Sequence, residues 1–205
     1  MNEHETDRLL GIQTAGVQDW GLRSIHDNRY EATPYEGLDA LLDEYRIGRT
    51  SSVVDFGCGK GRTAFYINHR TGASVTGVEM DGQLYLDALE NRNLYMIKKK
   101  NRLKGSVTFI RSRAEAYRAD PLDNVFYFFN PFSVSLFAKV LSNILKSVEE
   151  HPRTADLILY YPTLDYLSHL ENHSPFIHLK DVPVPGLSEK NPNERFSIWQ
   201  FKSFT

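Results

Sequence analysis

The stretch Val53-Val54-Asp55-Phe56-Gly57-Cys58-Gly59-Lys60-Gly61-Arg62 decides the fold of this 205-residue chain. Its β-branched and aromatic residues predict a buried strand that ends near Phe56. Three glycines at alternate positions follow, and residues 62–70 predict a helix directly after them. Glycine adopts positive φ and lets a ligand approach the main chain, while a helix N-terminus presents unpaired N–H groups. The stretch therefore predicts a strand, a turn and a helix that together bind a ligand.

An acidic strand end favours this interpretation over a βα turn without a ligand. Residues 74–79 predict a second strand that ends in Glu79, which lies 18 residues after Gly61 and 22 after Gly57. In dinucleotide-binding folds, an acid at about 20 residues beyond the glycine turn accepts hydrogen bonds from ribose hydroxyls. Glu79 is therefore predicted to bind a ribose.

The spacing of the glycines distinguishes between nucleotide cofactors. A dinucleotide fingerprint is Gly-x-Gly-x-x-Gly, whereas this chain has Gly-x-Gly-x-Gly. The motif resembles the first motif of class I S-adenosylmethionine-dependent methyltransferases. The resemblance implies S-adenosylmethionine as cofactor and S-adenosylhomocysteine as product. The cofactor-binding residues that it implies are Asp55, Gly57, Cys58, Gly59, Gly61, Glu79, Met80, Ala114, Glu115 and Asn130.

A second motif, Asn130-Pro131-Phe132, follows the apolar stretch 125–129, which predicts a central strand. It is similar to the Asn/Asp-Pro-Pro-Tyr/Phe motif of amino-group methyltransferases, with one proline missing. The resemblance implies that Asn130, Pro131 and Phe132 are catalytic: Asn130 accepts hydrogen bonds from an amine, and the face of Phe132 favours positive charge. The alternative interpretation is a strand end closed by an Asx-Pro turn.

Hydrophobic periodicity and turn signals predict the remaining elements. Thr33, Pro34 and Glu36 predict a capped helix start. The further predicted helices cover 33–46, 83–102, 133–150 and 163–171, and the further strands cover 107–111, 156–161, 176–184 and 195–201. The alternation of strands and helices predicts a parallel sheet, and the last two strands predict a hairpin. The resemblance implies a Rossmann-like α/β fold with seven mostly parallel strands in the order 3-2-1-4-5-7-6 and helices on both faces.

The chain is predicted to form one domain, 1–205, in which residues 1–50 are a helical extension or lid and 51–205 the cofactor-binding core. Tyr35 opens the first predicted helix and is a candidate for the lid of the pocket. Tyr161 follows the fifth predicted strand and is a candidate for the lining of the acceptor pocket, with core packing as the alternative.

Charge and composition exclude few functional classes. The net charge of −2 gives no global argument for nucleic acid, although the basic stretch 98–104 leaves RNA open. No apolar run is long enough for a membrane span, the N-terminus is unlike a signal peptide, and Cys58 is the only cysteine, so a cytoplasmic location is expected. Cys58 is interpreted as a packing residue. His169, His173 and His178 match no common zinc spacing, and no metal is expected.

The leading prediction is therefore a methyltransferase that uses S-adenosylmethionine to methylate a nitrogen of a small molecule or a protein side chain. A non-catalytic S-adenosylmethionine-binding protein and an RNA methyltransferase are the alternatives. A nicotinamide-dependent oxidoreductase is disfavoured by the glycine spacing and by the lack of a Tyr-x-x-x-Lys pair after the fourth strand. The sequence does not indicate the oligomeric state.

Overall fold

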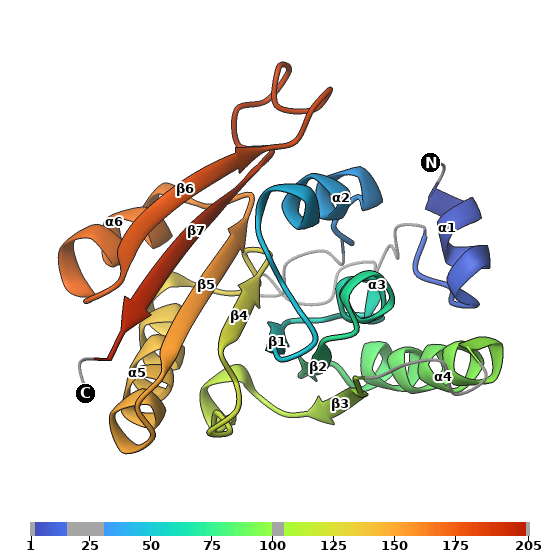
Figure 1. Ribbon diagram of the computed structural model, residues 1–205, viewed down its shortest axis with the longest axis horizontal. Coiled ribbons are helices and arrows are strands. Elements are labelled where there is room, and N and C mark those ends of the chain that lie inside the picture. Colours follow the sequence, from blue (N-terminus) through green and yellow to red (C-terminus); the bar gives the residue numbers. More distant parts are fainter. Residues whose placement is uncertain (1–2, 16–30, 100–104, 204–205) are drawn as a thin grey trace.

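A seven-stranded sheet forms the centre of the computed structural model, which describes residues 3–15, 31–99 and 105–203 (Figure 1). The strands are β1 (Ser52–Phe56), β2 (Ser74–Glu79), β3 (Val107–Arg111), β4 (Val125–Phe128), β5 (Thr154–Tyr160), β6 (Ile177–Pro183) and β7 (Arg195–Lys202). Their order is β3-β2-β1-β4-β5-β7-β6. The first five strands pair in parallel, and β7 is antiparallel to both β5 and β6. The predicted strand order and C-terminal hairpin are thus confirmed.

Helices cover both faces of the sheet (Figure 1). They are α1 (Glu3–Leu10), α2 (Tyr35–Glu44), α3 (Arg62–Thr71), α4 (Gly82–Lys99), α5 (Val134–Glu150) and α6 (Leu164–His173). The first four lie on one side of the sheet and the last two on the other. This two-sided cover explains why β4 is buried along its whole length.

The sheet divides the apolar core into two clusters. Tyr127 of β4 packs with the residues of α2 and α3, whereas Phe126 and Phe128 of the same strand pack with α5 and α6. This alternation is the two-residue period of a strand. Segments from both layers meet at the edge of the sheet where the parallel strands have their carboxyl ends.

The β6–β7 hairpin is closed below its loop by backbone hydrogen bonds. Val184 N donates to Glu194 O at 2.9 Å, and Tyr161 N donates to Arg195 O at 3.0 Å. The loop between Val184 and Glu194 therefore lies beside the carboxyl end of β5 (Figure 1). No helix among the described residues is long and apolar enough to cross a membrane.

The predicted capping box of α2 is wrong. The helix begins at Tyr35 without a side-chain cap, and Glu36 is exposed. The hydroxyl of Thr33 lies 2.7 Å from that of Tyr127, so it pairs with the central strand instead of a helix N–H. A buried tyrosine hydroxyl requires a partner, and Thr33 supplies it.

A polar cluster joins the N-terminal segment to the sheet. The carboxylate of Asp7 accepts hydrogen bonds from Thr14 N at 2.5 Å, Ala15 N at 2.8 Å and the Tyr35 hydroxyl at 2.5 Å. Arg62, the first residue of α3, donates from Nε to the Thr14 hydroxyl at 2.8 Å. Both charged residues are buried, so α1 is anchored by polar contacts rather than by an apolar stripe.

Candidate functional site

The glycine turn follows β1 and contacts the segment that follows β4. Gly57, Gly59 and Gly61 have φ angles of 73°, 53° and 88°, which lie in the left-handed region. A Cβ atom on Gly57 would lie 2.7 Å from Cβ of Pro131, so only glycine allows the loop after β4 to approach this closely. The two sequence motifs are therefore in direct contact.

Glu79 lies beside the glycine turn at the carboxyl end of β2, as predicted. Its carboxylate accepts a hydrogen bond from Gly59 N at 2.8 Å and from the N–H groups of Met80 and Asp81, also at 2.8 Å. Burial raises the pKa of Glu79 despite these three donors, which act in the opposite direction. Ser112 N donates to the Glu79 carbonyl at 3.0 Å and brings the end of β3 to the same edge.

Asp55 places a second carboxylate inside the sheet, behind the glycine turn. It is 3% exposed, and burial together with the charge of Glu79 raises its pKa to about 8. Among the described residues, no hydrogen-bond donor reaches this carboxylate. Burial thus favours the protonated form of Asp55, and a cation at this edge would favour its ionised form.

The segment Asn130-Pro131-Phe132 is fixed from both layers. Asn130 adopts a left-handed backbone with φ of 40°, and Pro131 contacts the glycine turn. On the other side, the hydroxyl of Tyr166 in α6 donates to the carbonyl of Phe132 at 2.5 Å. The Tyr166 ring is held in turn by stacking on Phe137, with ring centroids 4.0 Å apart. The three predicted catalytic residues therefore lie in one segment that contacts both the glycine turn and α6.

Two consecutive tyrosines lie at the end of the neighbouring strand β5: Tyr160 is its last residue and Tyr161 follows it. Tyr160 is buried, and its hydroxyl donates to Glu194 in the hairpin loop. Tyr161 has a φ of 50°, and its hydroxyl accepts a hydrogen bond from Asn191 Nδ2 at 2.8 Å. The site and the hairpin loop are therefore joined through consecutive side chains.

Of the remaining predicted cofactor residues, Cys58 lies within the glycine turn, Met80 follows Glu79, and Ala114 and Glu115 follow β3. Burial raises the pKa of Cys58 well above its usual range, which fits a packing residue. Met80 is 51% exposed next to Glu79. Ala114 and Glu115 form the 3₁₀ turn η1 (Ala114–Ala116), and Glu115 pairs with Arg113 at 3.6 Å.

Tyr35 contacts the N-terminal segment and Arg62, the residue that follows the glycine turn. Its side chain is 1% exposed, its hydroxyl binds Asp7, and the guanidinium of Arg62 lies 4.6 Å from its ring centroid. Its described contacts hold the N-terminal segment, so its proposed role as a lid gains no support from them.

Neither the RNA alternative nor a metal site, which the sequence did not predict, gains support from the described residues. No group of three or more His, Cys, Asp or Glu side chains in the described part of the chain is arranged to hold a metal ion. In the basic stretch, Lys98 donates to the carbonyl of Arg8, and the Lys99 ammonium lies 5.7 Å from the Tyr95 ring centroid. Residues 100–104 lie outside the described residues.

Asn91 of α4 is a site residue that the sequence analysis missed. Its Nδ2 donates to the carbonyl of Lys60 in the glycine turn at 3.1 Å, and its Oδ1 accepts from Gln13 N at 2.8 Å. The helical spacing indicates that Asn91 is buried, because it falls on the same helix face as buried Ala88 and Tyr95. A buried asparagine on an apolar face requires partners, and here they are the turn and the N-terminal segment.

No protein-family model matches the sequence, and no curated protein matches it. Solved structures do resemble it. A SAM-dependent methyltransferase from Aquifex aeolicus is 18% identical with a TM-score of 0.57, and the match covers 80% of this chain and 89% of that chain. An RNA methyltransferase from Salinibacter ruber, in complex with S-adenosyl-L-homocysteine, is 15% identical with a TM-score of 0.52 over 84% and 93% of the chains.

A magnesium protoporphyrin IX methyltransferase from Synechocystis, with bound SAM, is 13% identical with a TM-score of 0.52, and the match covers 80% and 74% of the two chains. At such identities the similarity concerns the fold, which methyltransferases with different acceptors share. The chain therefore has the fold of S-adenosylmethionine-dependent methyltransferases.

Proposed function

We propose that this chain is a methyltransferase that uses S-adenosylmethionine as its cofactor. The observation that carries the proposal is the carboxylate of Asp55, which is buried beside three glycines with positive φ and close enough to Glu79 for that charge to raise its pKa. A buried acid without a described donor fits a cationic ligand, and S-adenosylmethionine carries an ammonium and a sulfonium. The phosphate groups of an adenine dinucleotide would instead face the acidic side chains of Asp55 and Glu79.

Each side chain then has a distinct part in binding. Glu79 would accept hydrogen bonds from the ribose hydroxyls in exchange for Gly59 N, which the carboxylate holds at 2.8 Å. The glycine turn would face the amino acid moiety, with Asp55 behind it. The backbone of Ala114, which follows the Ser112 contact to Glu79, would lie along the adenine.

The proposed acceptor is a nitrogen of a small molecule or of a protein side chain. The bound cofactor supplies an electrophilic methyl group, so the protein needs chiefly to align the acceptor with it. The Asn130 side-chain oxygen and a backbone carbonyl of the same turn would accept the N–H bonds of the amine and direct its lone pair. Water can take the proton that the amine loses, since no strong general base is required. A cytoplasmic location is part of this proposal and is supported by the single cysteine.

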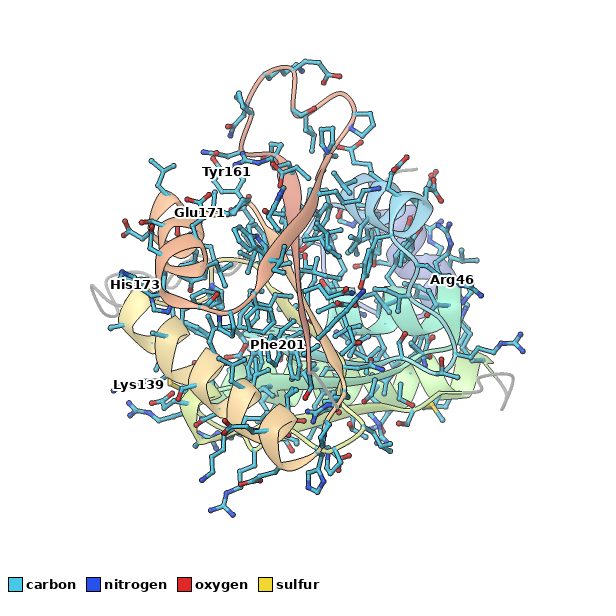
Figure 2. The ribbon with its side chains drawn as sticks, turned by 60° about the vertical axis from the view of Figure 1, so that its left-hand side comes forward. Arg46, Lys139, Tyr161, Glu171, His173 and Phe201 are labelled. Atoms are coloured by element: carbon cyan, nitrogen blue, oxygen red, sulfur yellow. The ribbon has the colours of Figure 1, made fainter. Side chains whose placement is uncertain are left out.

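Calorimetric titration with S-adenosylmethionine, S-adenosylhomocysteine and NADH tests the cofactor. We expect the two sulfur compounds to bind and Glu79→Ala to weaken them at least about tenfold, because hydrogen bonds to a charged group contribute about 1.5–3 kcal/mol each. Glu171→Ala, which changes an exposed acid of α6 (Figure 2), is the matched control and should leave the affinity unchanged. Binding of NADH alone would overturn the proposal.

Transfer of a labelled methyl group to a panel of amines tests catalysis. Asn130→Ala should lower turnover while S-adenosylhomocysteine still binds. Cofactor binding without turnover of any acceptor would favour the non-catalytic alternative. Turnover of RNA alone, with an affinity that falls steeply with salt, would favour the RNA alternative.

A further inference from the structure

The neighbouring strands β4 and β5 are each followed by a residue with positive φ, and these two residues lie at the same level of the sheet. Asn130 and Tyr161 are the non-glycine residues with positive φ in the described part of the chain. Strands β4 and β5 pair in parallel with Phe128 opposite Leu159, and this register, continued by two residues, places Asn130 level with Tyr161. A left-handed backbone is rare for a residue as bulky as tyrosine and is concentrated at functional sites. The second of these residues, Tyr161, therefore lies beside the proposed amine-binding residue.

The hairpin loop holds Tyr161 in this conformation. Tyr161 N donates to the carbonyl of Arg195 at 3.0 Å, and Nδ2 of Asn191 donates to the Tyr161 hydroxyl at 2.8 Å. Figure 2 shows Tyr161 at the base of the β6–β7 loop. The orientation of the Asn191 amide is fixed independently, because Asn193 N donates to its Oδ1 at 3.1 Å. The amide nitrogen, and not the oxygen, thus faces the tyrosine.

Because the Asn191 amide nitrogen donates to it, the Tyr161 hydroxyl acts as the acceptor in this contact. A phenol oxygen that accepts from an amide keeps its own proton for another partner. No described residue accepts that proton. The Tyr160 hydroxyl has the opposite role: it donates its proton to the carboxylate of Glu194 in the same loop. Of the two consecutive tyrosines, only Tyr161 therefore keeps a hydroxyl proton that no described residue accepts.

We propose that Tyr161 donates a hydrogen bond to the methyl acceptor and that Asn191 is the positioning residue that keeps its proton available. The acceptor then carries a neutral hydrogen-bond-accepting group, such as an amide carbonyl, in addition to the amine. A carboxylate is disfavoured because Glu194 and Glu31 both act electrostatically on the adjacent Tyr160. This inference rests on the proposed methyltransferase function.

A pair of probe compounds tests the inference. 4-Aminobenzamide carries an aromatic amine and a neutral carbonyl, whereas aniline carries the amine alone. Both are titrated by ligand-observed NMR into the full chain saturated with S-adenosylhomocysteine. The wild-type protein should prefer 4-aminobenzamide by about five- to tenfold, the effect of one hydrogen bond. Tyr161→Phe should reduce this preference to about one.

Asn191→Asp provides the sharper variant, because it reverses the polarity of the contact with Tyr161 and keeps the shape of the side chain, at the cost of one added negative charge. A carboxylate at this position accepts the Tyr161 proton, so the preference should again fall to about one. Asn172→Asp is the matched control, since Asn172 is exposed and its amide donates to Ser168 within α6. The control should keep the wild-type preference.

The outcomes separate this inference from the proposed function. Failure of S-adenosylhomocysteine to bind contradicts the proposed function itself. If it binds, equal affinity for the two probes, no binding of either probe, or a preference that survives Tyr161→Phe each overturns the role of Tyr161. A preference lost in Tyr161→Phe but kept in Asn191→Asp overturns the positioning role of Asn191.

Discussion

Replacing Asp55 by asparagine should make folding less sensitive to pH. In the folded state its pKa is about 8, against 3.8 for an unperturbed carboxyl group. Between these values the unfolded chain has lost the proton and the folded chain keeps it, so wild-type stability falls as pH rises. The slope is about 1.4 kcal/mol per pH unit, which amounts to about 4 kcal/mol between about pH 4 and pH 7.

Asparagine keeps the shape of the protonated acid and has no proton to lose in this range. The free energy of unfolding of Asp55→Asn should therefore exceed that of the wild type by an amount that grows up to about pH 8 and is constant above it. Urea denaturation of both proteins at several pH values between about 5 and 9 measures this difference. Titrating groups that do not interact with Asp55 are common to the two proteins and cancel, whereas Glu79, whose charge acts on Asp55, does not cancel fully.

The same variant should bind S-adenosylhomocysteine more weakly, because it offers no negative charge to the ligand's ammonium group. Its gain in stability and its loss of affinity thus have one cause. A stability difference that does not change with pH, or a variant that is less stable than the wild type at pH 8, would refute the reasoning about Asp55.

Three further substitutions have expected outcomes. Gly57→Ala should abolish S-adenosylhomocysteine binding in calorimetry, because the added methyl group would lie 2.7 Å from Cβ of Pro131 at a residue with φ of 73°. Tyr166→Phe should lower methyl-transfer turnover without changing cofactor affinity, because it frees the Phe132 carbonyl; Tyr95→Phe, a buried tyrosine of α4, is its control. Asp7→Ala should destabilise the fold by about 2–4 kcal/mol in urea denaturation, since it leaves buried donors without their acceptor.

The sheet could be predicted because its strands carry local signals. The predicted bounds of β2 and β3 agree with the structure, since each is a short run rich in β-branched residues. The hairpin followed from two such runs around a loop rich in Gly, Pro and Asn. The proximity of the two motifs follows from the predicted strand order, because adjacent parallel strands end at one edge, but the contact between Gly57 and Pro131 was found only in the structure.

The N-terminal region could not be predicted in the same way. The buried residues of α1 include Thr6 and Asp7, so the helix has no apolar stripe that periodicity could detect. Its partners Arg62 and Tyr35 are far along the chain, and a polar contact leaves no local pattern. The wrong prediction at Thr33 has the same origin. Its side chain is suited to capping a helix, but its hydroxyl pairs with that of Tyr127, which is distant in the sequence.

The hydrogen bond between Val184 and Glu194 has a consequence for how this protein can diversify. It seals the hairpin beneath its loop, so residues 185–193 connect two fixed anchor points and hold no strand in register. Such a segment can be exchanged for one of another length or sequence while the sheet beneath it stays intact. Under the proposed function, exchanging this one loop should therefore change which acceptor is methylated, while the residues proposed to bind the cofactor stay the same.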